Sequence, residues 1–124
     1  MNFRITLLAL LLGFAIACGD SYSPPAPSSM PPPSGSGIPA SIVARASTMT
    51  TTAYAPNPIT VSVGGTVTWT NNDSTTHTST ADAGAWNSGS IAPGGQFSRT
   101  FPTAGAFPYH CSIHPGMIGT VTVQ

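Results

Sequence analysis

The chain has 124 residues with only three basic and three acidic side chains, and it contains neither lysine nor glutamate. A basic surface that could hold nucleic acid is therefore absent. Thr, Ser, Gly, Pro and Val are abundant and good helix formers are scarce beyond the first residues, so the composition favours an all-β domain with many turns.

The N-terminus has the pattern of a signal peptide. Arg4 is followed by an apolar run over residues 5–16, which is too short for a comfortable membrane span and fits the core of an export signal. The alternative is a buried N-terminal helix, but a helix so uniformly apolar would need a larger domain to cover it. We therefore predict a signal peptide at residues 1–17.

The cleavage site allows two outcomes. Residues 15–18, Ala-Ile-Ala-Cys, resemble a bacterial lipobox, in which Cys18 is lipidated and becomes the first mature residue. The same residues also fit ordinary cleavage at a small-x-small site, which would leave a soluble periplasmic protein. The polar residues 19–21 and the tail behind them favour the lipoprotein, anchored to a membrane on its periplasmic side.

Residues 18–40 have the composition of a linker. They are rich in Pro, Ser and Gly, and such a segment cannot bury enough apolar surface to fold. We predict that they tether the lipid anchor to the domain that follows. A Pro-rich peptide ligand for a partner protein is the weaker alternative, because linkers are the commoner use of such sequence.

From residue 41 the pattern changes to short extended runs separated by turn signals. Residues 59–63 and 66–70 alternate apolar and polar side chains on either side of Gly64-Gly65, as the two strands of a hairpin do. About seven short strands at regular spacing predict a β-sandwich over residues 41–124. Residues 81–95 are expected to form a loop, and the other expected strands cover residues 42–46, 48–55, a run that begins at His77, 96–101, 106–110 and 118–123.

The segment after the expected strand 106–110 carries three potential metal donors. Cys111, His114 and Met117 lie three residues apart on a loop with Pro and Gly, so their side chains can converge on one point. His77 is the best candidate for a fourth donor. Two imidazoles, one thiolate and a weakly held thioether form the ligand set of a blue-copper centre. Zinc is the chemical rival, but methionine does not suit zinc, which usually completes its shell with a charged donor or water.

The two cysteines are not expected to form a disulfide. Cys18 lies at the processing site, so a bridge to Cys111 is implausible, although the compartment is an oxidising one. A free thiol kept in such a compartment needs a reason, and metal ligation by Cys111 supplies one.

Residues 59–77, ITVSVGGTVTWTNNDSTTH, and 97–123, FSRTFPTAGAFPYHCSIHPGMIGTVTV, resemble the two signature regions of the cupredoxins, the type 1 blue-copper proteins. The short spacing of the last three donors is similar to that of amicyanin, whereas plastocyanin has a longer gap before its methionine. The resemblance implies a Greek-key β-sandwich that holds one type 1 copper ion. It implies His77, Cys111 and His114 as close ligands and Met117 as the weak axial ligand.

One residue departs from this resemblance. Small cupredoxins commonly have Asn after the first ligand histidine, where it braces the ligand loop and bonds near the cysteine sulfur. The present chain has Thr78 there, whose side chain has a shorter reach. The departure puts the tuning of the reduction potential in question, though not metal binding.

The expected function is that of an electron carrier and not an enzyme. Partner proteins are expected to dock near His114, beside Pro115 and Gly116, onto a monomer that is held at the membrane through Cys18. The resemblance also implies that His114 can protonate and leave Cu(I), so the reduction potential is expected to rise as the pH falls.

The alternative function is a lipoprotein that sequesters or delivers copper. A copper enzyme fits poorly, because a second copper centre needs further histidines and only His110, expected to point away from Cys111, is left over.

Overall fold

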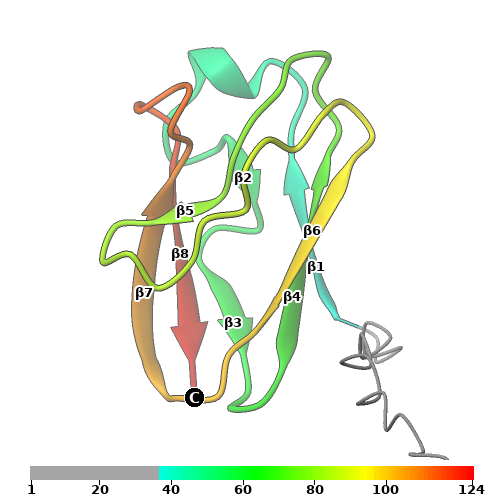
Figure 1. Ribbon diagram of the computed structural model, residues 1–124. Helices are drawn as coiled ribbons and strands as arrows, with labels where there is room; N and C mark the ends of the chain where they lie inside the picture. The colour runs from blue at the N-terminus through cyan, green and yellow to red at the C-terminus, as the bar shows by residue number, and fades with distance from the viewer. Residues whose placement is uncertain (1–36) are drawn as a thin grey trace, which may run out of the picture. The chain divides into compact units, whose positions relative to one another are not determined.

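The computed structural model describes residues 37–124, which form a sandwich of two four-stranded β-sheets (Figure 1). The strand order is β2-β1-β4-β6 in the first sheet and β3-β8-β7-β5 in the second. This arrangement confirms the predicted all-β sandwich. The elements are β1 (Ile38–Ile42), the 3-10 helix η1 (Ala46–Thr48), β2 (Tyr54–Ala55), β3 (Ile59–Val61), β4 (Thr66–Asn71), β5 (Thr80–Ala81), β6 (Gln96–Thr100), β7 (Gly105–His110) and β8 (Ile118–Val123).

The predicted signal peptide, Cys18 and most of the predicted linker lie outside the described residues. Within residues 37–124, no helix is long and apolar enough to cross a lipid bilayer.

The strands follow the alternation of the sequence, but the predicted hairpin around Gly64-Gly65 was wrong, because β3 belongs to the second sheet and β4 to the first. In β4, Val67, Trp69 and Asn71 are buried and the residues between them are partly exposed. In β8, Gly119, Val121 and Val123 are buried in the same alternating way. A strand with one apolar face must bury that face against a second layer, and the two sheets supply those layers to each other.

The prediction of a strand at residues 42–46 was wrong. The strand lies earlier, at Ile38–Ile42, where it pairs in parallel with β4 from Ile38 opposite Val67 to Ile42 opposite Asn71. Arg45 then adopts a left-handed conformation with φ 63° and starts η1. The chain leaves the sheet here because the Arg45 amide donates to the carboxylate of Asp73, 3.0 Å away, rather than to a neighbouring strand. The predicted strand at 48–55 is likewise reduced to its last two residues, β2.

An aromatic cluster joins the two sheets. Trp69 is fully buried in β4, and its indole nitrogen donates to the hydroxyl of Tyr109 in β7 at 3.2 Å. The two rings meet edge to face with centroids 5.5 Å apart, an arrangement that aromatic pairs favour. Trp86 comes from the predicted loop and packs edge to face on Phe101, so this loop closes the core from the side.

The end of the sandwich that carries η1 in Figure 1 also carries the orange-red loop that joins β7 to β8. β7 ends at His110, immediately before Cys111, and β8 begins at Ile118, immediately after Met117. On the other sheet, β4 ends at Asn71 and the chain turns towards His77. The two segments that carry the predicted metal donors therefore leave different sheets at the same end of the domain.

Gly119 is required by the close packing of β8 on Tyr109. A Cβ atom at Gly119 would lie 2.4 Å from Tyr109 Cζ and 2.6 Å from its hydroxyl oxygen. Because Tyr109 is fully buried, its side chain cannot move away from an added methyl group.

We predict that Gly119→Ala lowers the free energy of unfolding of the metal-free protein by about 1–3 kcal/mol, the usual cost of overpacking, as measured by chemical denaturation. Gly116→Ala is the control, because no atom lies within 4 Å of its added Cβ, and an equal loss in both variants would contradict the prediction.

Candidate metal centre

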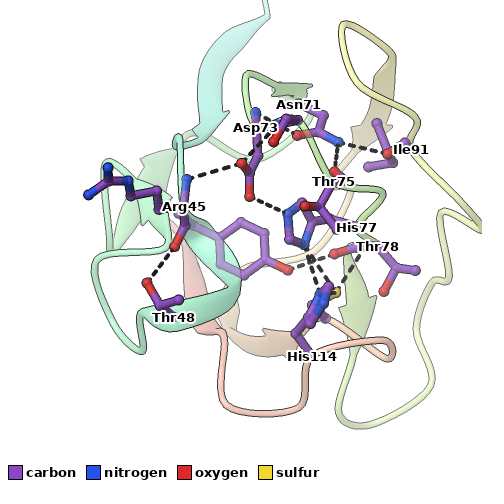
Figure 2. A network of polar contacts seen from close by, with 12 residues as sticks. Arg45, Thr48, Asn71, Asp73, Thr75, His77, Thr78, Ile91 and His114 are labelled. Atoms are coloured by element: carbon purple, nitrogen blue, oxygen red, sulfur yellow. Dashed lines mark hydrogen bonds and ion pairs between the residues drawn. The ribbon is translucent and has the colours of Figure 1, made fainter.

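The structure brings three of the predicted donors together. Cys111 Sγ lies 3.7 Å from His77 Nδ1 and 3.9 Å from His114 Nδ1, and the two ring nitrogens are 3.2 Å apart (Figure 2). Among the described residues, these three form the one group of three or more His, Cys, Asp or Glu side chains whose donor atoms can share a metal ion. His77 and Cys111 are fully buried and His114 is partly exposed.

The segments that carry His77 and Cys111 are each held by their own backbone hydrogen bonds. His77 exchanges two backbone hydrogen bonds with Ile91, of 3.2 and 2.8 Å. The loop from Cys111 closes on itself, because the Cys111 amide donates to the Met117 carbonyl at 3.1 Å and the Met117 amide donates to the His114 carbonyl at 2.9 Å. Met117, the last residue of this loop, is fully buried. The four predicted ligands thus belong to two short, internally bonded segments.

The surroundings of the Cys111 sulfur are polar but uncharged. The Thr78 amide donates to Cys111 Sγ at 3.3 Å. The hydroxyl of Tyr54 donates to the Thr78 carbonyl at 2.6 Å. Burial, with a smaller contribution from neighbouring Cys111, raises the pKa of Tyr54 far above its ordinary value, so this phenol stays neutral and brings no negative charge to the sulfur.

Thr78, the departure noted in the sequence, braces the two segments. Its hydroxyl oxygen accepts the amide of Ser112 at 2.8 Å, directly after Cys111. The same hydroxyl lies 3.0 Å from that of Thr80, which in turn lies 2.9 Å from that of Ser112. The short threonine side chain therefore reaches the ligand loop, and the backbone amide of Thr78 supplies the contact to sulfur.

Asp73 is a site residue that the sequence prediction missed. Its Oδ2 lies 2.9 Å from His77 Nε2, on the side of the imidazole away from the cluster (Figure 2). Its Oδ1 accepts the amides of Arg45 at 3.0 Å and Ser74 at 2.8 Å. The hydrogen bond from His77, supported by these amides, lowers the pKa of Asp73 from 3.8 to about 2. The available signal was an acidic residue four positions before a candidate ligand in a short turn.

His110 lies apart from the cluster, as expected from its place in the strand. Its Nδ1 faces Asp82 Oδ1 at 2.5 Å, and both side chains are partly exposed.

The donor set suits copper. Two imidazole nitrogens and one sulfur converge in a mostly buried place, and the Asp73 carboxylate meets the far nitrogen of His77. Soft thiolate with imidazole selects copper, zinc or iron centres, whereas magnesium and calcium require oxygen ligands.

Comparison with known proteins points to the same metal. Residues 41–124 match the family described as copper binding proteins, plastocyanin/azurin family. The chain is 37% identical over 84 residues to plastocyanin from Scenedesmus fuscus, covering 57% of this chain and 86% of that one. It is 36% identical over 69 residues to amicyanin from Paracoccus denitrificans, covering 52% of this chain and 53% of amicyanin.

Solved structures give the same picture. A purple cupredoxin from Nitrosopumilus maritimus superimposes with a TM-score of 0.65 at 33% identity, over 70% of this chain and 99% of that one. The Cu(I) form of an amicyanin mutant superimposes with a TM-score of 0.62 at 29% identity, over 73% of this chain and 84% of that one.

The lowered pKa of Asp73 predicts an acid sensitivity of the metal-free protein. Because its folded-state pKa is depressed, the stability that Asp73 contributes is fully present above about pH 4 and is lost as the pH falls through about 2. We predict that the free energy of unfolding falls over this interval in the wild-type protein and falls less in Asp73→Asn, as measured by denaturant titrations at a series of pH values. The prediction would be contradicted if the free energy of unfolding fell equally with pH in the two proteins.

Proposed function

The chain belongs to the plastocyanin/azurin family of copper-binding proteins, and from this premise we propose that it carries single electrons between redox partners through one type 1 copper site. The proposed ligands are His77, Cys111, His114 and Met117. The observation that carries the proposal is the convergence of two imidazole nitrogens and one thiol sulfur within 4.8 Å of one another. Copper, when bound, takes up and releases one electron.

The protein's contribution is to hold the donors still. His77 is fixed by its backbone pairing with Ile91, and the loop of Cys111 is fixed by its own hydrogen bonds to Met117. The Thr78 hydroxyl and amide tie the two segments together. A site whose ligands do not have to move can change oxidation state with little reorganisation, which is what a carrier requires.

His114 is the proposed port for electrons. It is partly exposed, and the neighbouring Pro115 and Gly116 are exposed. Two large apolar side chains nearby in the sequence are also exposed, Ile113 at 48% and Ile118 at 45%. Such side chains near a half-buried donor favour docking through apolar contact, with little steering because charges are few.

We further propose that the protein is exported and lipid-anchored at Cys18, with residues 1–17 as the signal peptide. The stretch between Cys18 and β1 would be the tether, which is slightly shorter than the predicted 18–40 because residues 38–40 already belong to β1 of the sandwich. The apolar run of residues 5–16 and the Pro/Ser/Gly-rich stretch behind it support this arrangement. Ordinary signal cleavage, giving a soluble periplasmic carrier, remains the alternative.

The central test is an absorption spectrum recorded after addition of Cu(II). We predict a strong visible thiolate-to-copper band that is abolished in Cys111→Ser, because the band requires the sulfur as a ligand. Cys18→Ser is the matched control and should keep the band in full. A band that survives in Cys111→Ser would refute the proposed site.

The same samples separate an electron carrier from a protein that stores or delivers copper. A carrier should exchange electrons quickly between its Cu(I) and Cu(II) forms and release copper slowly to a chelator. Slow exchange with rapid release would favour copper handling instead.

The proposed docking surface can be tested with electron self-exchange as the probe. We predict that Ile113→Asp lowers the self-exchange rate constant about tenfold or more, because it replaces apolar contact with repulsion between two copies of the same charge. Val63→Asp is the control: Val63 is 51% exposed, and its amide donates to the Gln124 carbonyl at the opposite end of the domain (Figure 1). Equal effects of the two substitutions would contradict the proposed port.

A further inference from the structure

Asp73 is a buried acid with an unusual set of partners. The residue is 7% exposed. One carboxylate oxygen accepts two backbone amides and the other faces His77 Nε2. We propose that Asp73 is a positioning residue that fixes the tautomer of His77 and lowers the reduction potential of the copper centre. The inference rests on the proposed copper site and adds to it a determinant of the potential.

The tautomer follows from hydrogen-bonding chemistry. An ionised carboxylate only accepts hydrogen bonds, and a neutral imidazole has one N–H donor and one acceptor nitrogen. With Asp73 Oδ2 at 2.9 Å, His77 Nε2 must carry the proton. The lone pair is then on Nδ1, the atom that lies 3.7 Å from Cys111 Sγ and 3.2 Å from His114 Nδ1. The carboxylate therefore leaves the nitrogen that faces the cluster ready to bind a metal.

The position of Asp73 is itself set by the sandwich. The Asp73 amide donates to Asn71 Oδ1 at 2.9 Å. Asn71 is fully buried at the end of β4, and its side-chain amide donates to the carbonyls of Thr75 at 2.8 Å and Ile91 at 2.9 Å (Figure 2). These hydrogen bonds fix the turn to the end of β4 and place Asp73 against His77.

Among residues 37–124, no arginine side chain offsets the charge of Asp73. Arg45 contacts the carboxylate through its backbone amide, and its side chain is exposed. Across residues 37–124, no Arg side chain forms an ion pair with Asp73. A full negative charge thus lies one hydrogen bond and one imidazole ring from the metal position. Such a charge stabilises Cu(II) more than Cu(I), so it lowers the reduction potential.

The first test uses the metal-free wild-type protein and nitrogen NMR of the histidine rings. The proposal requires His77 to be protonated at Nε2 and unprotonated at Nδ1 at neutral pH. The opposite tautomer, or a mixture of both, would overturn it. This measurement needs neither copper nor a variant.

The second test compares Asp73→Asn with Asp82→Asn. Both remove one negative charge, but Asp82 is an exposed residue that contacts His110 outside the cluster. Asp73→Asn keeps a side-chain oxygen as an acceptor. We expect this substitution to shift the ratio of Cu(II) to Cu(I) affinity about tenfold towards Cu(I), which raises the reduction potential by about 59 mV for one electron. Asp82→Asn should shift the potential much less. Equal shifts, or no shift in Asp73→Asn, would overturn the proposal.

The proposed copper site and the proposed role of Asp73 can fail separately. If wild-type protein shows no Cys111-dependent copper band, the proposed function fails. If the band is present in wild type and both variants but their potentials do not differ, only the role of Asp73 fails. If Asp73→Asn does not fold, the NMR measurement on the wild-type protein still decides the tautomer.

Discussion

The metal centre depends on one constraint: the segment that runs from β4 in the first sheet to β5 in the second must be held in register with the loop between β7 and β8. The bond from the Ser112 amide to the Thr78 hydroxyl and the bond from the Thr78 amide to the Cys111 sulfur provide this connection. Both are hydrogen bonds in a buried or half-buried setting, where a lost partner is costly. The donor atoms converge because each segment is held by its own backbone hydrogen bonds and Thr78 joins the two.

Around this connection the structure distributes charge sparingly. The sulfur is contacted by an amide and lies near a phenol that remains neutral, and the Asp73 carboxylate meets the outer nitrogen of His77. Buried polar groups are tolerated only when they are hydrogen-bonded, and Asp73 meets this condition with three partners. The polar network and the metal site are thus parts of one arrangement.

Much of this could be predicted from the sequence, and the failures have physical causes. Alternation in residues 59–63, 66–70 and 118–123 predicted the strands, although not that β3 and β4 lie in different sheets. The spacing of Cys111 and His114 predicted that both approach His77. The first strand was misplaced because residues 43–46 have the composition of a strand, whereas the Arg45 amide donates a hydrogen bond to the Asp73 carboxylate instead of to a neighbouring strand. The contact between Asp73 and His77 was missed because a hydrogen bond across a turn leaves no periodic pattern in the sequence. The role of Thr78 was underestimated because its hydroxyl bonds to Ser112, which lies 34 residues away.

The hydrogen bonds within and between the two segments fix the donor atoms, so their positions should change little with copper binding or oxidation state. Crystal structures of the metal-free, Cu(I) and Cu(II) forms at neutral pH would test it most directly. The account predicts that His77 Nδ1, Cys111 Sγ and His114 Nδ1 keep nearly the same positions in all three forms. Rings that turn away from the sulfur in the metal-free form, or a ligand that leaves on reduction at neutral pH, would contradict it.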